Sequence, residues 1–209
     1  MKSSRLLGPL GLLLTVAGLA SCGASTRFTD MWKDPSLTTL QEFKKVAVFA
    51  ITSDMSMRRV VEDEVVKNVK KREAVASYTF LNQEQIKNVD YVKSTLKDMG
   101  FDSAVTLRVV GVDDRTTYVP GSYSTSAAYP APYYSFGGYY GYATPMMYEP
   151  GYNITERYVN VETNIYRMAD EKLVWSGRSE TVDPTSATEL VRQVAQEAAL
   201  VFSQQGLMK

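Results

Sequence analysis

Short apolar runs typical of strands alternate along this chain with segments whose apolar residues recur every three to four positions. The run VAVFAI, within residues 45–52, is continuous and rich in β-branched side chains, as in a strand buried on both faces. The next segment places Met57, Val61 and Val65 between charged residues at helical spacing. Because such strands must be covered by helices, residues 45–207 predict one α/β (α+β) domain, a mixed sheet with helices packed on it.

Capping signals support the last predicted helices. Gly100 follows a short helix as its probable C-cap, and Gly206 stops the final one. Ser186 and Glu189 have the spacing of a capping box. The predicted order is β-α-β-α-β-β-β-α, with strands at 45–52, 74–80, 102–112, 156–168 and 173–181 and helices at 57–69, 90–99 and 187–205.

The first predicted helix carries acidic residues early and basic residues late. Glu62, Asp63 and Glu64 precede Lys67 and Lys70, an arrangement that suits the helix dipole. A solvated helix face is the simplest interpretation of these charges, so we expect the three acids to face water.

The N-terminal residues have the layout of a secretory signal. Lys2 and Arg5 precede an apolar run from Leu6 to Ala20, and small residues follow it. A helix that spans a bilayer needs about twenty apolar residues, so this shorter run makes a poor permanent anchor. Residues 1–21 therefore predict a cleaved signal peptide.

The leader ends in Leu19-Ala20-Ser21-Cys22, which resembles the bacterial lipobox. The resemblance implies cleavage between Ser21 and Cys22, a diacylglyceryl group on the cysteine sulfur and acylation, for example with palmitate, of the new amino terminus. By the sorting rule of such lipoproteins, Gly23 implies the outer membrane, and we expect the protein to face the periplasm. The alternative is an ordinary signal cut near Ala20, which would leave Cys22 as a free thiol.

Residues 22–44 are polar and mixed, and we interpret them as the lipidated N-terminus followed by a tether. Fully extended, residues 23–44 would reach roughly 70 Å. Docking of Trp32 and Phe43 on the domain would shorten that reach.

The composition offers little for enzyme chemistry. The chain has no histidine, and Cys22 is its single cysteine, which removes the commonest general base, the commonest metal ligand and a thiol nucleophile. Without the leader, 21 positive and 23 negative side chains remain, and a net charge of −2 gives no electrostatic case for nucleic acid. We expect no metal, no nucleic-acid partner and no cofactor other than the covalent lipid on Cys22.

A tyrosine-rich insertion, residues 115–154, separates the third and fourth predicted strands. No residue from 116 to 148 is charged, and residues 114–153 hold ten of the fourteen tyrosines and five of the eight prolines. Tyrosine with serine and glycine is also the composition of binding loops in antibodies, so we expect a contact loop for an envelope protein or a glycan. The candidate contact residues are Tyr118, Tyr123, Tyr133, Tyr134, Tyr139, Tyr140 and Tyr142.

Two other interpretations of the insertion stay open. It is a low-complexity loop without a specific ligand, or its ends extend the flanking strands into a longer ribbon. A membrane-spanning hairpin is less favoured, because Pro120, Pro130, Pro132 and Pro145 interrupt each candidate strand.

Several short motifs are spread over residues 30–207. They are Trp32-Lys33-Asp34-Pro35, the run KKVAVFAIT, Arg58 and Arg59 with Glu62-Asp63, Ser77-Tyr78, Gly100-Phe101-Asp102, Tyr118-Val119-Pro120-Gly121 and Val174-Trp175-Ser176-Gly177. With these motifs the chain resembles a broad set of bacterial lipoproteins of unassigned function. Its element order is similar to the small α/β domains of the curli secretion channel lipoprotein, the activator lipoprotein of penicillin-binding proteins and the N-terminal domain of the Tol β-propeller protein. Fold alone does not fix function.

These observations favour a non-enzymatic, membrane-anchored envelope protein that binds or assembles through the tyrosine-rich loop. One alternative is a hydrolase acting on envelope material through carboxylates, either Asp113-Asp114 or Glu62-Asp63-Glu64. Another is a structural homo-oligomer whose subunits pair through sheet edges.

Overall fold

A six-stranded mixed sheet forms the centre of the protein in a computed structural model, which describes residues 25–70, 72–123 and 148–208. For residues 122–123 and 148–149 it describes the backbone only. The strand order is β1-β8-β7-β4-β2-β3, with β2 parallel to β3 and β4 and the other pairs antiparallel. The strands are β1 (Ser25–Lys33), β2 (Lys45–Ala50), β3 (Glu73–Ala76), β4 (Ser103–Val119), β7 (Tyr152–Arg167) and β8 (Lys172–Val182).

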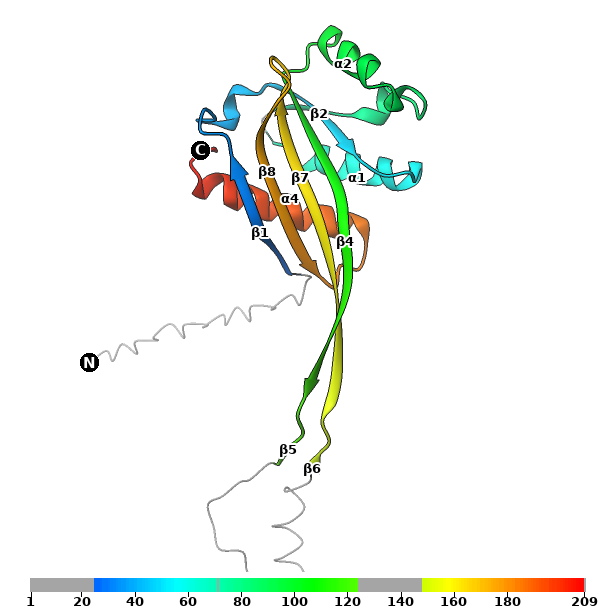
Figure 1. The fold of residues 1–209 in the computed structure, drawn as a ribbon, viewed down its shortest axis with the longest axis vertical. Helices are drawn as coiled ribbons and strands as arrows, with labels where there is room; N and C mark the ends of the chain where they lie inside the picture. The colour runs from blue at the N-terminus through cyan, green and yellow to red at the C-terminus, as the bar shows by residue number, and fades with distance from the viewer. Residues whose placement is uncertain (1–24, 71, 124–147, 209) are drawn as a thin grey trace, which may run out of the picture.

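Helices lie on both faces of the sheet, as the α/β prediction requires (Figure 1). Val48 on β2 packs with Val65 of α1 and Val191 of α4, whereas Phe49 on the opposite side of β2 packs with Leu96 of α2. Burial on both faces explains the uninterrupted apolar run of β2. The helices are α1 (Met55–Asn68), α2 (Val89–Asp98) and α4 (Ala187–Gln204), with 3-10 turns at η1 (Leu40–Glu42), η2 (Ser77–Thr79) and η3 (Gln85–Lys87).

The helix ends form as the capping signals predict. The Ser186 side chain accepts from the Glu189 backbone N–H, and Asn88 does the same for Tyr91 at the start of α2. Gly100, which follows the C-cap residue Met99 of α2, has a φ of 72°, the left-handed conformation that favours glycine at this position.

The tether prediction for residues 22–44 is wrong for the part that the structure describes. Residues 25–33 form edge strand β1, which pairs antiparallel with β8, and η1 follows it. Leu37, Leu40 and Phe43 then enter the core beside Trp175. β1 lies at the sheet edge, and most of its side chains are polar and exposed. Its residues therefore lack the apolar alternation that would predict a strand.

Three predicted strands have other bounds than expected. The strand at 74–80 stops at Ala76, because residues 77–79 turn into η2. The strands at 102–112 and 156–168 are longer than predicted and run on to Val119 and back to Tyr152. Both ends of the 115–154 insertion are therefore β-ribbon, the alternative that the sequence left open.

Candidate functional site

The predicted contact residues fall into described and undescribed parts of the chain. Tyr118 lies in β4, and Tyr123 lies in the two-residue strand β5 (Ser122–Tyr123), which pairs with β6 (Tyr148–Glu149). The lipidation and cleavage residues Cys22 and Ser21 lie outside the described residues, as do Tyr133, Tyr134, Tyr139, Tyr140 and Tyr142.

A two-stranded ribbon leaves the sheet where the other strands end. Residues 152–157 of β7 pair with residues 114–119 of β4, whereas β8 begins to pair with β7 only at Tyr158. We call residues 114–119 and 152–157 the arm. Figure 1 shows it projecting from the end of the sheet opposite α2, with β5 and β6 continuing in the same direction.

One face of the arm is held by cross-strand polar pairs. Arg157 Nε lies 3.0 Å from Asp114 Oδ1, and this hydrogen bond holds the pKa of Asp114 below its usual value. The hydroxyls of Thr116 and Thr155 lie 2.9 Å apart. Such opposite pairs stabilise a ribbon that no helix covers.

The aromatic ring of Tyr118 extends this face beyond the threonine pair. A Cβ atom added at Gly151 would collide with the Tyr118 phenol, so the absence of a side chain there makes room for the ring. Tyr118 is nevertheless 62% exposed. The phenol is thus positioned by the opposite strand but not covered.

The other face of the arm begins with a cluster around Glu180 of β8. Glu180 is buried and accepts hydrogen bonds from Arg115 and from Arg27 of β1, the latter at 2.9 Å. These bonds, with Arg115 first, lower the pKa of Glu180. The Arg115 guanidinium also lies 3.8 Å from the centre of the Tyr158 ring. Arg115 therefore ties the arm to both β8 and β7.

Beyond this charged base, the described side chains of the arm are uncharged. Tyr152 is 59% exposed and Ile154 is 40% exposed, and both lie on the Arg115 face of the ribbon. From residue 116 to residue 155 the only charged residue in the sequence is Glu149. The arm thus presents aromatic and aliphatic groups on two exposed faces.

The two carboxylates of the predicted Asp113-Asp114 pair do not share a site. They lie in the middle of β4 rather than at a strand end, and successive strand residues point to opposite faces. Asp113 accepts from the Asn160 side chain at 3.2 Å, and Asp114 pairs with Arg157. An acid and a base on opposite faces cannot act on one bond.

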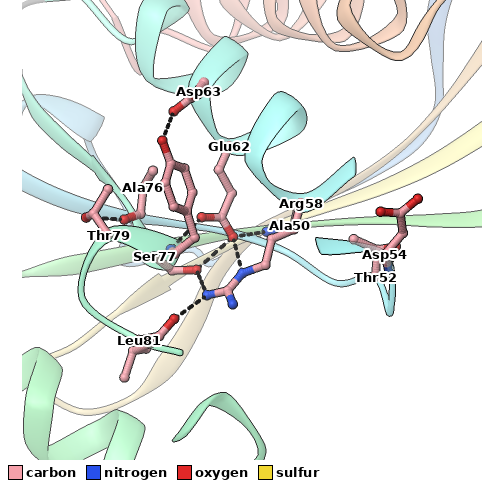
Figure 2. A network of polar contacts seen from close by, with 11 residues as sticks. Ala50, Thr52, Asp54, Arg58, Glu62, Asp63, Ala76, Ser77, Thr79 and Leu81 are labelled. Carbon is pink, nitrogen blue, oxygen red and sulfur yellow. Dashed lines mark hydrogen bonds and ion pairs between the residues drawn. The ribbon is translucent and has the colours of Figure 1, made fainter. Parts of the chain in front are cut away.

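The expectation of a solvated acidic face on α1 is wrong for Glu62 and Glu64. Glu62 is 0% exposed, and its Oε1 atom accepts from Arg58 Nε at 3.0 Å and from the Ser77 hydroxyl at 2.7 Å (Figure 2). It also accepts from the Ala50 backbone N–H at 3.0 Å. These partners join α1 to β2 and η2.

The neighbouring acids are also engaged within the fold. Asp63 accepts from the Tyr78 hydroxyl at 2.7 Å, a bond that raises the tyrosine pKa. Glu64 accepts from Asn68 and lies 3.4 Å from Lys67 Nζ. The Glu62-Asp63-Glu64 group is thus part of the packing of α1 and does not form an open acid–base pair.

An apolar cleft of 560 Å³ opens between α1 and α4 beside the base of the arm. Met57 and Val61 of α1 face Leu190 of α4 across a floor that includes Val109 and Val159. Val109 is 53% exposed and Val112, one step nearer the arm, is 56% exposed. Exposed apolar surface at this end of the body therefore reaches the base of the arm, where the Asp114–Arg157 ion pair begins.

Two kinds of feature are absent from residues 25–70, 72–123 and 148–208, the part of the chain that the structure describes. Among these residues, no group of three or more acidic or sulfur side chains is placed to hold a metal ion. Within the same residues, no helix combines the length and the apolar character needed to cross a bilayer.

Sequence reasoning missed the residues that fix the arm. Arg115 and Glu180 are far apart in the chain, and nothing local marks them as a pair. Gly151 and Tyr152 lay inside a segment interpreted as a loop. One sequence signal does indicate the longer strand β7. It is the alternation in residues 152–158, which continues the pattern of the predicted strand at 156–168.

No family model matches the chain, and no curated protein matches it either. Similar solved structures include a leucine-to-methionine variant of the PelC dodecamer from Paraburkholderia phytofirmans, at 11% identity over 88% of this chain and 99% of that chain, with a TM-score of 0.40. Lipoprotein GNA1162 from Neisseria meningitidis is 11% identical over 77% of this chain and 99% of that chain, with a TM-score of 0.39. A PDZ domain protein from Parabacteroides distasonis is 13% identical over 90% of this chain and 37% of that chain, with a TM-score of 0.36. Similarity at this level identifies neither a family nor a function.

Proposed function

We propose that this protein is a lipid-anchored component of the bacterial envelope, at the outer membrane and facing the periplasm, that acts without catalysis as a binding or assembly module. Its contact element is the arm. The observation that carries the proposal is that β4 and β7 continue as an exposed ribbon after every neighbouring strand has ended, and that its described side chains are uncharged beyond Arg115 and Glu156. A ribbon with no role in covering the core is well suited to contact another surface.

The sequence upstream of β1 supports the anchor. The lipobox cysteine, Cys22, precedes the first residue of β1, Ser25, by only three positions. A lipid there holds the sheet close to the membrane rather than at the end of a long tether. Three acyl chains give stable attachment, because one chain alone binds only marginally.

The anchor is tested by mass spectrometry of the N-terminal peptide from membrane-extracted protein. We expect this peptide to begin at Cys22 and to carry a thioether-linked diacylglyceryl group and an amide-linked acyl chain. The Cys22→Ser variant should keep its leader and lack both. A mature chain that begins near Ala20 with a free thiol would contradict the proposal.

The arm is tested by shortening it without disturbing the sheet. Replacing residues 117–154 by Asn-Gly joins Thr116 to Thr155, which already face each other, through a two-residue hairpin turn. We expect crosslinked products of the full-length protein in intact cells to disappear in this variant. Tyr91→Ala, which removes an exposed tyrosine from α2 at the other end of the body, is the control and should keep them.

A homo-oligomer is the second candidate, and edge strand β1 favours it. Among the described residues no strand pairs with the outer edge of β1, which is nine residues long. Open edges of this kind can pair with a second chain. The mass of the delipidated protein in solution decides between a single chain and an assembly.

A further inference from the structure

The first residue of β1 lies level with the base of the arm. Ser25 pairs with Val182, Val182 pairs with Tyr158, and Tyr158 pairs with Asp113, directly before the arm. Figure 1 shows β1 starting at the end of the sheet from which the arm projects. The chain from Cys22 to Ser25 spans at most about 11 Å. A lipid on Cys22 would therefore hold the membrane surface within that distance of the first residue of β1.

The arm is longer than this link. From Asp113 to Val119, β4 advances six residues, or about 20 Å at the rise of a strand. The proposed anchor is attached at the level where the body ends and the arm begins. A membrane held there lies against either the body or the arm. Their chemistry decides which one.

The body carries charge over its described surface, whereas the arm beyond its base does not. α2 and the turn before β8, at the far end of the body, bear the Lys93–Glu171 ion pair. In the arm, the charged groups stop at Arg115 and Glu156. The uncharged side chains beyond them include Tyr118, Tyr152 and Ile154, together with the polar Thr116, Thr117, Asn153 and Thr155. Tyrosines with an apolar ring and a polar hydroxyl are enriched where a bilayer meets water. Moving the charges of the far end into that zone costs free energy that the arm does not incur.

We propose that the arm lies against the lipid surface, with Tyr118, Tyr152 and Ile154 at the headgroup level of the membrane that holds Cys22. This inference rests on the lipid anchor proposed above and names the partner of the arm as lipid. Val112, which lies in β4 just before the arm, and Val109 are also exposed. The charged cluster of Arg27, Arg115 and Glu180 then lies on the water side of the interface.

The test uses a tryptophan placed on the arm. Tyr118→Trp and Tyr91→Trp replace two exposed tyrosines at opposite ends of the protein, and the unsubstituted chain supplies the signal of Trp32 and Trp175. Each acylated protein is reconstituted into vesicles of phosphatidylethanolamine and phosphatidylglycerol, with or without brominated acyl chains. The proposal predicts that bromine removes most of the added fluorescence of Tyr118→Trp and leaves that of Tyr91→Trp unchanged.

Equal fluorescence of Tyr118→Trp in brominated and ordinary vesicles would overturn the proposal and favour a protein partner for the arm. Quenching at Tyr91→Trp instead would show that the body faces the lipid, with the same consequence. If Cys22 proves not to be acylated in cells, the proposed lipid anchor is wrong, but that result does not test whether the arm contacts lipid. In that case the Cys22 thiol, the single thiol of the chain, is coupled to a maleimide lipid, and bromine quenching of Tyr118→Trp is measured in the same way.

Discussion

The same two strands, β4 and β7, pass through two different environments. In the body, Leu107, Val161 and Ile165 are buried beneath helices, and hydrophobic burial holds the strands together. In the arm, no helix of the described residues covers either face, and cross-strand pairs such as Thr116 with Thr155 hold the two strands together. One continuous hairpin thus divides into a part that stabilises the fold and a part that is free to contact something else.

The difference implies that damage to the two regions should have different consequences. Truncating a buried side chain loses its transfer free energy and leaves a cavity, whereas truncating an exposed side chain of the arm costs little. The predictions below test this division, and they run from the largest expected loss of folding stability to the smallest.

Trp175→Ala should destabilise the body most. Trp175 is 0% exposed, packs edge-on against Phe28 and Phe202, and donates from its indole nitrogen to Gln205 at 3.2 Å. We expect the free energy of unfolding to fall by about 4 kcal/mol in urea titrations. Trp32→Ala, at an exposed tryptophan, should change it by less than about 0.5 kcal/mol. Similar losses in both variants would contradict the assignment of Trp175 to the core.

Arg58→Met should cost about 3 kcal/mol, because it leaves the buried carboxylate of Glu62 without its cation. The double variant Arg58→Met with Glu62→Leu removes both charges and should recover a large part of the loss. Urea unfolding of the two variants gives the comparison. If the double variant is less stable than Arg58→Met alone, the ion pair does not act as a unit.

Arg115→Gln should flatten the acid limb of the stability profile. Hydrogen bonds from Arg115 and Arg27 hold the pKa of folded Glu180 below its ordinary value. The stabilisation is therefore complete above the unfolded pKa, about 4.3, and is lost as the pH falls through the lower folded value. Unfolding midpoints measured from about pH 6 to about pH 3 should decline more steeply in the unsubstituted protein than in Arg115→Gln. If the unfolding midpoints of the two proteins decline in parallel with pH, Arg115 is not the cause of the pH-dependent stabilisation.

Closing the arm with Asn-Gly between Thr116 and Thr155 should have the smallest effect on stability. The body keeps every residue that contacts its helices, so we expect a change within about 0.5 kcal/mol in the same urea titration. A loss of about 2 kcal/mol or more would show that the arm belongs to the cooperative fold and would break the comparison between the two regions.

Local patterns were enough to predict much of the body. The apolar run of β2, the helical spacing of Val61 and Val65 and the cap at Ser186 are signals contained within a few residues. They led to the α/β class and to the three α-helices of the described residues.

The errors arose where a partner lies far away in the chain. β1 is a strand because β8 lies beside it, although its own side chains are mostly polar. Glu62 is buried because Ala50 and Ser77 bring donors to it, which no helix pattern could reveal. For the candidate site, the sequence indicated the uncharged tyrosines but not that the ribbon of β4 and β7 carries Tyr118 beyond the level of Ser25, the first residue of β1.

The account depends most on the claim that the arm, and not the body, is the contact element. A photoreactive phenylalanine analogue at position 118 or at position 91, each replacing a native tyrosine, tests it directly in intact cells. After irradiation, adducts with lipid or with another envelope component should form from position 118 and be absent from position 91. Adducts of equal yield at both positions, or adducts from position 91 alone, would contradict the account.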